Sequence, residues 1–319
     1  MVVRELVVLG TASQAPTRYR NHNGYLLRWD GTDVLFDPGE GTQRQLILAD
    51  ARVSSIARIC ITHFHGDHCL GLPGVVQRMS LEGRSGPIEL CYPASGERYV
   101  EHLLDASVFD RRTEVHRRSV SADGVVDSGP PYTLVARRLE HEPETFGWRI
   151  EEPAGRTMVP ERLEALGVRG PDVGELRRAG ALAVPGRHQP VRVEEVSVAR
   201  PGQVVAFVMD TGLCDAAFAL AEGADLLVCE ATFATAEADL ARDFRHLTAA
   251  QAARIAAESG VRRLVITHFS QRYLDEQVHL EEAGDIFDGV VAARDLLRVP
   301  VPPRAQPGSD SWPAGVRPQ

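Results

Sequence analysis

The sequence predicts a layered α/β fold. Short runs of β-branched and aliphatic residues, typical of buried strands, alternate along the chain with stretches of helical pattern. The apolar fraction of 44% is that of a globular protein, and 319 residues are enough for one large domain or two of ordinary size. Several of the predicted strands run directly into histidines or aspartates. We therefore expect one edge of the layered sheet to carry the functional side chains.

The chain is predicted to begin as a β-meander. Residues 6–9 read as the first strand, and residues 25–29 and 34–37 as the next two. An Asp-Gly step at positions 30 and 31 joins the second and third strands, which is a hairpin signal. A helix is predicted to begin near Gln43.

Strands and helices alternate in the rest of the chain. The helix that begins after Thr248 has a capping box, because Gln251 follows Thr248 three residues later. The predicted strands are 57–61, 88–92, 133–139, 204–209, 225–229, 263–267 and 290–292. The predicted helices are 71–79, 97–104, 215–223, 275–283 and the one after Thr248.

A cluster of metal-ligand residues follows the strand at 57–61. His63, His65, Asp67 and His68 lie within six residues, and Zn²⁺ favours such ligands at about 2.0 to 2.2 Å. An exposed polar turn would also contain polar residues, but three histidines and an aspartate so close together favour a metal site. The spacing cannot place all four on one face of a helix. We therefore expect a loop that holds two neighbouring metals, in which Gly66 permits a tight turn.

Further candidate ligands stand at other strand ends. His141, Asp210 and His268 each follow a predicted strand, which gives seven ligands in all, enough for two metals with Asp210 as the bridge. Two divalent ions about 3.5 to 4 Å apart suit hydrolysis of an ester, amide or phosphodiester. His246 stands just outside a helix start, where a fixed backbone can aim it. Asp37 is interpreted either as a partner that orients a ligand or as a helix cap.

Composition excludes several classes of protein. No run approaches eighteen apolar residues, so no membrane span is expected, and the Arg4-Glu5 pair makes the N-terminus a strand rather than a signal peptide. Five scattered cysteines without a CxxC pair argue for a reducing cytoplasm. Lysine is absent, and the net charge of -9 means that any RNA binding must rest on local basic patches.

Residues 151–196 interrupt the regular pattern. Prolines and glycines punctuate short charged pieces over a length unusual for a connection inside a compact domain. Both a solvated excursion and a protruding arm that meets a polyanion fit this composition. From residue 302 the Pro/Gly/Ser-rich tail is predicted to be disordered. Arginines recur through the interruption and just past it, at positions 156, 162, 169, 177, 178, 187, 192 and 200.

These motifs carry a family resemblance. THFHGDH, with His141, Asp210 and His268, resembles the metallo-β-lactamase fold, a four-layer αβ/βα sandwich with a binuclear zinc site at one edge. Within that fold, residues 1 to about 300 resemble tRNase Z (ribonuclease Z), an endonuclease that removes 3′ trailers from tRNA precursors. The piece GPDVGELRRAG is similar to the family's exosite, an arm that grips the tRNA. The supporting motifs are VVLGTAS, FDPGEGTQRQL, ITHFHGDHCLGLPG, VCEATF, HLTAAQAA and ITHFSQRY.

The resemblance implies a role for each matching residue. His63, His65 and His141 would hold one zinc, and Asp67, His68 and His268 the other, with Asp210 on both. Asp67 would also be the base for the attacking water, and His246 would contact the scissile phosphate and protonate the leaving oxygen. Substrate contacts are expected from Ser270, Arg272 and Tyr273, and from Arg177 and Arg178 of the arm.

The resemblance also implies a homodimer in which one subunit's arm serves the other's site. Mn²⁺ or Fe²⁺ can use similar ligands, so two Zn²⁺ per subunit is the expected loading but not the only one. One departure is Gly212, where the family commonly has an arginine.

Two other functions fit the sequence. A small-molecule phosphodiesterase or thioester hydrolase of the same fold would have no use for an arginine-bearing arm. An RNA-binding protein with a structural metal is disfavoured, because structural zinc is normally closed by four ligands and this chain offers seven.

Overall fold

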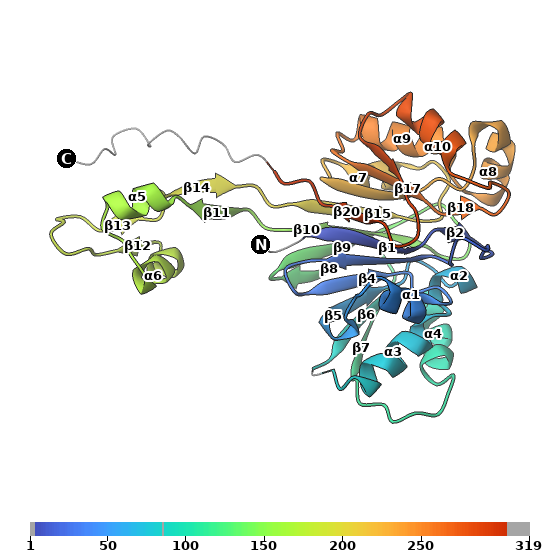
Figure 1. Cartoon of the computed structure of the whole chain (residues 1–319), viewed down its shortest axis with the longest axis horizontal. Helices are drawn as coiled ribbons and strands as arrows, with labels where there is room; N and C mark the ends of the chain where they lie inside the picture. Colours follow the sequence, from blue (N-terminus) through green and yellow to red (C-terminus); the bar gives the residue numbers. More distant parts are fainter. Residues whose placement is uncertain (1–3, 85, 305–319) are drawn as a thin grey trace. The chain divides into compact units, whose positions relative to one another are not determined.

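The computed structural model describes residues 4–84 and 86–304 of the chain. Two seven-stranded sheets face each other, and helices cover the outer face of each sheet (Figure 1). Apolar side chains from both sheets form one core between the sheets. Each sheet also shares one further core with the helices on its outer face. The layers thus run helix, sheet, sheet, helix, which confirms the predicted sandwich.

The first sheet begins as the predicted meander. Its first three strands in chain order pair antiparallel, and the next three continue the sheet in parallel. A strand near the end of the described chain returns to pair with the first. In spatial order the strands are β20 (Arg298–Pro300), β1 (Glu5–Gly10), β3 (Gly24–Arg28), β4 (Asp33–Phe36), β5 (Ile56–Cys60), β6 (Ile88–Pro93) and β7 (Val115–Val120).

The second sheet is parallel at one side and antiparallel at the other. Its strands in spatial order are β19 (Val290–Ala292), β17 (Leu264–Thr267), β16 (Leu226–Glu230), β15 (Val204–Val208), β10 (Phe146–Glu151), β9 (Tyr132–Arg138) and β8 (Gly124–Gly129). A short parallel pair, β2 (Ala12–Ser13) with β18 (Phe269–Ser270), joins a segment that follows the first sheet's opening strand to one that follows β17.

The helices form the outer layers. The capping box predicted for the helix after Thr248 is confirmed. Thr248 Oγ1 accepts the Gln251 N–H at 3.2 Å, and Gln251 Oε1 accepts the Thr248 N–H at 2.9 Å. Covering the first sheet are α1 (Thr42–Leu48), α3 (Leu72–Leu81) and α4 (Glu97–Leu104). Covering the second are α7 (Asp215–Ala221), α9 (Ala249–Glu258) and α10 (Gln277–Gly284). The same part of the chain also contains the short helices α2 (Gly66–Cys69) and α8 (Ala238–Phe244), and 3-10 turns at Val53–Ser55, Ala94–Gly96 and Thr235–Glu237.

In the two large sheets, the sequence analysis missed the edge strands β7, β8 and β20 and also one central strand, β10, which lies between β15 and β9. Strands β7 and β8 are the last strands of their sheets, and most of their side chains are exposed or half-buried. An edge strand with few buried side chains lacks the apolar run or the alternation by which strands are recognised. Strand β20 is also an edge, only three residues long. Missing these strands therefore shortened the predicted sheets without changing the fold class.

Residues 152–203 form a separate compact unit, together with Pro303 and Arg304 at the described end of the chain. The unit has its own small apolar core, which includes Leu163, Leu176 and Val196. The interruption in the sequence pattern therefore contains regular structure. It consists of β11 (Gly155–Met158) paired with β14 (Ser197–Arg200), α5 (Pro160–Ala165), α6 (Pro171–Ala179), and β12 (Ala181–Leu182) paired with β13 (Val191–Arg192).

The arginines of this unit differ in their surroundings. Arg162 is only 4% exposed, and Arg156 donates to Ser197 Oγ at 2.7 Å, so both belong to the internal structure of the unit. Arg177 and Arg178 of α6 are exposed, and no hydrogen bond or ion pair links them to another described residue. Only the exposed arginines can meet an external polyanion.

The predicted disordered tail falls mostly outside the described residues. Pro302, where the tail is predicted to begin, is buried, and residues 305–319 are not described. In the described part of the chain, every helix is too short or too polar to cross a membrane.

His279 of α10 gives a prediction about stability. It is buried between the rings of Phe269 and Tyr273, with centroid distances of 4.9 and 4.4 Å. Burial, and next the positive charge of Arg20, lowers the pKa of His279 to about 4. Because an unperturbed histidine titrates near 6.5, the unfolded chain binds the proton first, and stability falls as the pH drops from about 6.5 toward 4.

We expect His279→Phe to remove this part of the acid sensitivity. Between pH 7.5 and 5, the free energy of unfolding of the metal-free wild type should fall by about 2 kcal/mol more than that of the variant. Urea unfolding at both pH values measures the difference. His102→Phe, at an exposed histidine of α4, is the control and should behave as the wild type. Equal losses in the wild type and His279→Phe would contradict the prediction.

Candidate metal centre

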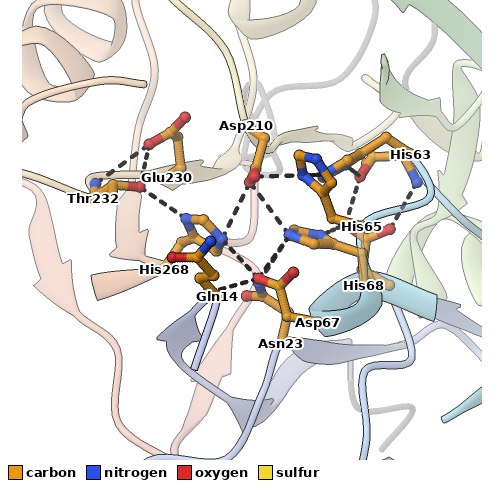
Figure 2. Close-up of polar contacts among 12 residues, drawn as sticks. Gln14, Asn23, His63, His65, Asp67, His68, Asp210, Glu230, Thr232 and His268 are labelled. Atoms are coloured by element: carbon orange, nitrogen blue, oxygen red, sulfur yellow. Dashed lines mark hydrogen bonds and ion pairs between the residues drawn. The ribbon is translucent and has the colours of Figure 1, made fainter. Parts of the chain in front are cut away.

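Strand ends from both sheets converge on one edge of the sandwich (Figure 2). His63 follows β5, Asp210 follows β15 and His268 follows β17, while His141 lies in the turn between β9 and β10. Asp210 and His268 have φ angles of 43° and 62°, and Asp37, which follows β4, has φ 43°. Non-glycine residues keep such left-handed angles only where the surrounding structure fixes them. The edge is therefore a rigidly built site.

The histidine cluster differs in one respect from the predicted loop. Asp67 and His68 lie in the single helical turn α2, which Gly66 opens. Gly66 begins this turn without a positive φ. A Cβ at Gly66 would lie 2.9 Å from Cδ1 of Leu70, the end of a flexible side chain.

The two carboxylate oxygens of Asp210 face two separate groups of side chains. Oδ2 lies 3.5 Å from Nε2 of His63 and 3.8 Å from Nε2 of His141. His65 completes this first group, since its Nδ1 is 3.0 Å from His63 Nε2. Potential ligand atoms of all four residues lie within 4.8 Å of one another.

The second group lies on the other side of Asp210. Oδ1 is 3.5 Å from Nε2 of His68 and 3.2 Å from Nε2 of His268. Asp67 Oδ2 lies 3.3 Å from the same nitrogen of His68 and 3.5 Å from that of His268. The structure thus brings together all seven residues that the sequence singled out, in two groups that share Asp210.

Unpartnered atoms in the centre fit metal ions. Nε2 of His141, Nε2 of His268 and Oδ1 of Asp210 are buried, and none has a hydrogen-bond partner among the described residues. A buried polar atom without a partner is costly, whereas imidazole nitrogen and carboxylate oxygen are the ligands that zinc prefers. The donor set and its orphaned atoms therefore match a centre for metal.

Protonation in the metal-free centre is uneven. Burial lowers the pKa of His63, His65 and His141, which leaves neutral rings with lone pairs to donate. Burial also acts to lower the pKa of His68, but the carboxylates of Asp210, Asp67 and Asp37 outweigh it and raise that pKa well above its usual value. Metal binding must therefore displace a proton from His68, which makes metal affinity fall as the pH falls.

Asp37 orients a ligand and does not cap a helix. Its Oδ2 lies 2.8 Å from Nδ1 of His68 and accepts the Thr62 hydroxyl at 2.7 Å, while Oδ1 accepts the Thr62 N–H at 2.7 Å. The N-cap of the following helix α1 is Gly41. Of the two interpretations of Asp37, the ligand-orienting one is therefore correct.

We expect Asp37→Asn to lower metal affinity about 10- to 100-fold, the usual cost of losing a partner that orients a ligand. Asparagine has one acceptor oxygen, so it cannot accept from Thr62 and His68 with both arms. Competition with a chelator of known zinc affinity measures the change. Asp33→Asn is the control, because Asp33 is also buried but accepts from Trp29 and Ser55 instead. Unchanged affinity in Asp37→Asn would contradict the prediction.

Glu230 is a site residue to which the sequence analysis gave no role. It ends β16 fully buried, and its Oε1 lies 2.9 Å from Nδ1 of His246. Its Oε2 accepts the hydroxyl of Thr232 at 2.6 Å, and that hydroxyl lies 2.8 Å from Nδ1 of His268. One buried carboxylate thus orients His246 directly and His268 through Thr232. The signal was a glutamate at a strand end in VCEATF, which alone is no different from a cap.

The centre opens into a cavity of about 610 Å³. Ser270 and Arg272, two of the residues predicted to contact substrate, line it, and so does His246. Tyr273 does not, because its hydroxyl is bound by the Ala234 N–H and donates to Glu237. A cavity beside a metal centre, with a basic side chain in its wall, suits a phosphodiester.

Comparison with known proteins identifies the family. The metallo-beta-lactamase superfamily matches residues 17–268. A ribonuclease Z of Nocardia farcinica is 56% identical over 306 residues, which are 95% of this chain and 100% of the relative. The chain belongs to the ribonuclease Z family. Ribonuclease Z of Chlamydia muridarum is 41% identical over 96% of this chain and 100% of its own length.

A solved structure extends the likeness to the fold. The short form of human tRNase Z has a TM-score of 0.69 and 25% sequence identity, and the match covers 93% of this chain and 99% of that one. The resemblance on which the sequence analysis relied is thus confirmed. Ribonuclease Z enzymes are endoribonucleases by name, which confirms the predicted hydrolase class.

Proposed function

We propose that the chain is a zinc-dependent endoribonuclease that removes the 3′ trailer from tRNA precursors. The products are a 3′ hydroxyl on the tRNA and a 5′ phosphate on the trailer. The observation that carries the proposal is the division of Asp210 between two ligand groups, which provides for two metals in one centre. The names of the relatives, ribonuclease Z and tRNase Z, supply the substrate class.

The proposed metal ligands are those of the two groups. His63, His65, His141 and Asp210 would hold one Zn²⁺, and Asp67, His68, His268 and Asp210 the other. Two divalent ions supply Lewis-acid stabilisation of the attacking and leaving oxygens of a phosphodiester. The protein itself supplies orientation and proton transfer.

Asp67 and His246 are the proposed proton carriers. Asp67 would bind metal as an ionised carboxylate, the form that accepts a proton from the attacking water. Without metal, burial acts to raise the pKa of Asp67, but His68 and His268 outweigh it and lower that pKa. The Gln14 N–H fixes the Oδ2 of Asp67 at 2.8 Å. The Nδ1 of His246 faces Glu230, which leaves Nε2 to contact the phosphate and protonate the departing 3′ oxygen.

The decisive assay uses a 3′-extended tRNA transcript and zinc-loaded protein. Wild type should cut near the discriminator nucleotide, and His65→Ala should not, because it removes a ligand of the first group. His102→Ala, at an exposed histidine outside both groups, should cut as wild type does. No cut by folded, metal-loaded wild type would overturn the proposed function.

The separate unit at 152–203 is the proposed tRNA-binding arm, with Arg177 and Arg178 as phosphate contacts. Structured RNA is read largely by shape and phosphate contacts. A homodimer, in which one subunit's arm serves the other's site, and a cytoplasmic location remain parts of the same proposal.

We expect Arg177→Ala with Arg178→Ala to raise the KM for the tRNA precursor and to leave hydrolysis of bis(p-nitrophenyl) phosphate unchanged. The slope of log KM against log salt should fall by about one for each lost phosphate contact. Arg242→Ala with Arg254→Ala, at exposed arginines of the main unit, is the matched control. A small-molecule hydrolase would show no difference between the two double variants on any substrate.

A further inference from the structure

Two exposed apolar side chains line the metal cavity. Leu70 is 52% exposed and Phe244 is 61% exposed, although both belong to the wall of the cavity that contains Asp67, His141 and His246. Ligand cavities are lined largely by apolar side chains, so these two are placed to contact a ligand in the cavity. The proposed roles of the metal ligands and proton carriers make no use of either side chain.

Each of the two stands two residues from a histidine of the site, on backbone that is hydrogen-bonded in place. Leu70 comes two residues after His68, caps α2, and donates its N–H to the Gly66 carbonyl at 3.0 Å. The backbone of Leu70 is therefore held at the end of this helical turn, next to the histidine cluster.

Phe244 has the corresponding place on the second-sheet side. It ends α8 two residues before His246, whose N–H donates to the Ala241 carbonyl at 2.7 Å. The intervening Arg245 is left-handed, with φ 54°, and its carbonyl accepts from Nδ1 of His141 at 3.1 Å. Helices α2 and α8 belong to different halves of the sandwich in Figure 1. The two apolar side chains thus come to the cavity wall from elements of different halves of the sandwich.

The cavity wall near Ser270 and Arg272 contains both an apolar ring and a cation. Phe233 is 6% exposed, and the guanidinium of Arg272 lies 5.4 Å from its ring centroid. Arg272 also donates to Ser270 Oγ at 3.3 Å and makes no ion pair with a described residue. Apolar faces next to an available cation match a nucleotide chain, in which base faces alternate with phosphates.

We propose that Leu70 and Phe244 form a nucleobase subsite that holds the unpaired bases on either side of the scissile phosphate. The inference rests on the proposed function and adds the contacts that select single-stranded nucleotides at the cut. Because every base has an apolar face, such packing is independent of base identity. In a duplex the faces of the bases are stacked on neighbouring bases, so the subsite requires nucleotides that can splay apart.

The test combines side-chain and base removal. The substrates are a 3′-extended tRNA and the same RNA with an abasic nucleotide immediately before or after the cut. Phe244→Ala and Leu70→Ala should each lower kcat/KM on the intact RNA about 5- to 150-fold, as expected for lost base stacking or packing. An abasic substrate should lower the kcat/KM of the wild type similarly. The variant that lacks the side chain packed against the missing base should lose little more on that substrate.

Controls separate this role from a structural one. Leu81→Ala, at a leucine of α3 that is 77% exposed and does not line the cavity, should behave as wild type. Phe244→Tyr keeps the aromatic face and should retain activity, and zinc content should be equal in all variants. All four bases at the two positions should be cut at rates within a few-fold of one another.

The outcomes are distinguishable. Additive losses from side-chain and base removal, or loss of zinc in Phe244→Ala and Leu70→Ala, would overturn the subsite while leaving the endoribonuclease in place. Failure of wild type to cut any 3′-extended tRNA would instead overturn the proposed function on which the subsite rests.

Discussion

Asp210→Asn is expected to lower kcat/KM on 3′-extended tRNA by well over 100-fold and to leave the protein with less than its full complement of zinc. One oxygen of Asp210 faces His63 and His141, and the other faces His68 and His268. Asparagine keeps one oxygen and replaces the other by an NH₂ group, which donates hydrogen bonds and has no lone pair for a metal. Losing a partner that merely orients a ligand costs about 10- to 100-fold, so losing a shared ligand must cost more.

Two measurements are needed, zinc content by elemental analysis and steady-state cleavage of the transcript. Asp295→Asn is the control, because Asp295 accepts hydrogen bonds from Thr11 and Asn21 outside both ligand groups. The control should keep its zinc and its activity. Full zinc content together with wild-type cleavage in Asp210→Asn would contradict the assignment of Asp210 as the shared ligand.

The candidate ligands could be predicted from the sequence because each follows a recognisable strand. Strands β5, β15 and β17 are fully or almost fully buried, and the apolar runs that bury them end at His63, Asp210 and His268. Parallel strands bring such ends to one edge of a sheet. His141 was harder to assign, since a lone histidine in a turn has no signal of its own, and only the series of strand ends raised it.

Other features depend on contacts that no local pattern records. Glu230 orients His246 from a position 16 residues away, and nothing in the sequence separates it from an ordinary strand-end acid. The fold class was predicted despite the missed strands, including the buried β10, because the other buried strands and the helices carry its signal. The internal structure of residues 152–203 was missed because a core of a few aliphatic residues leaves only a weak periodic pattern.

Glu230→Gln is expected to remove the alkaline activity of the zinc-loaded enzyme. Burial acts to lower the pKa of His246, but the buried carboxylate of Glu230 outweighs it and raises that pKa to about 9. Glutamine has no charge, so the pKa of His246 in the variant must fall. His246 donates a proton in the proposed reaction, and its protonated form then disappears at a lower pH. The alkaline limb of the kcat profile should therefore shift toward neutrality.

Profiles of kcat between pH 6 and 10 measure this shift, with His246→Ala as the reference. His246→Ala should lower kcat about 100- to 10,000-fold, the range for a general acid or base, and should lack the alkaline limb altogether. Glu230→Gln should approach wild-type kcat at the acid end and His246→Ala at the alkaline end. An unshifted limb with uniformly low kcat would assign Glu230 a purely structural role, because a misplaced His246 loses activity equally at every pH. A shifted limb requires that the charge of Glu230 act on the proton of His246.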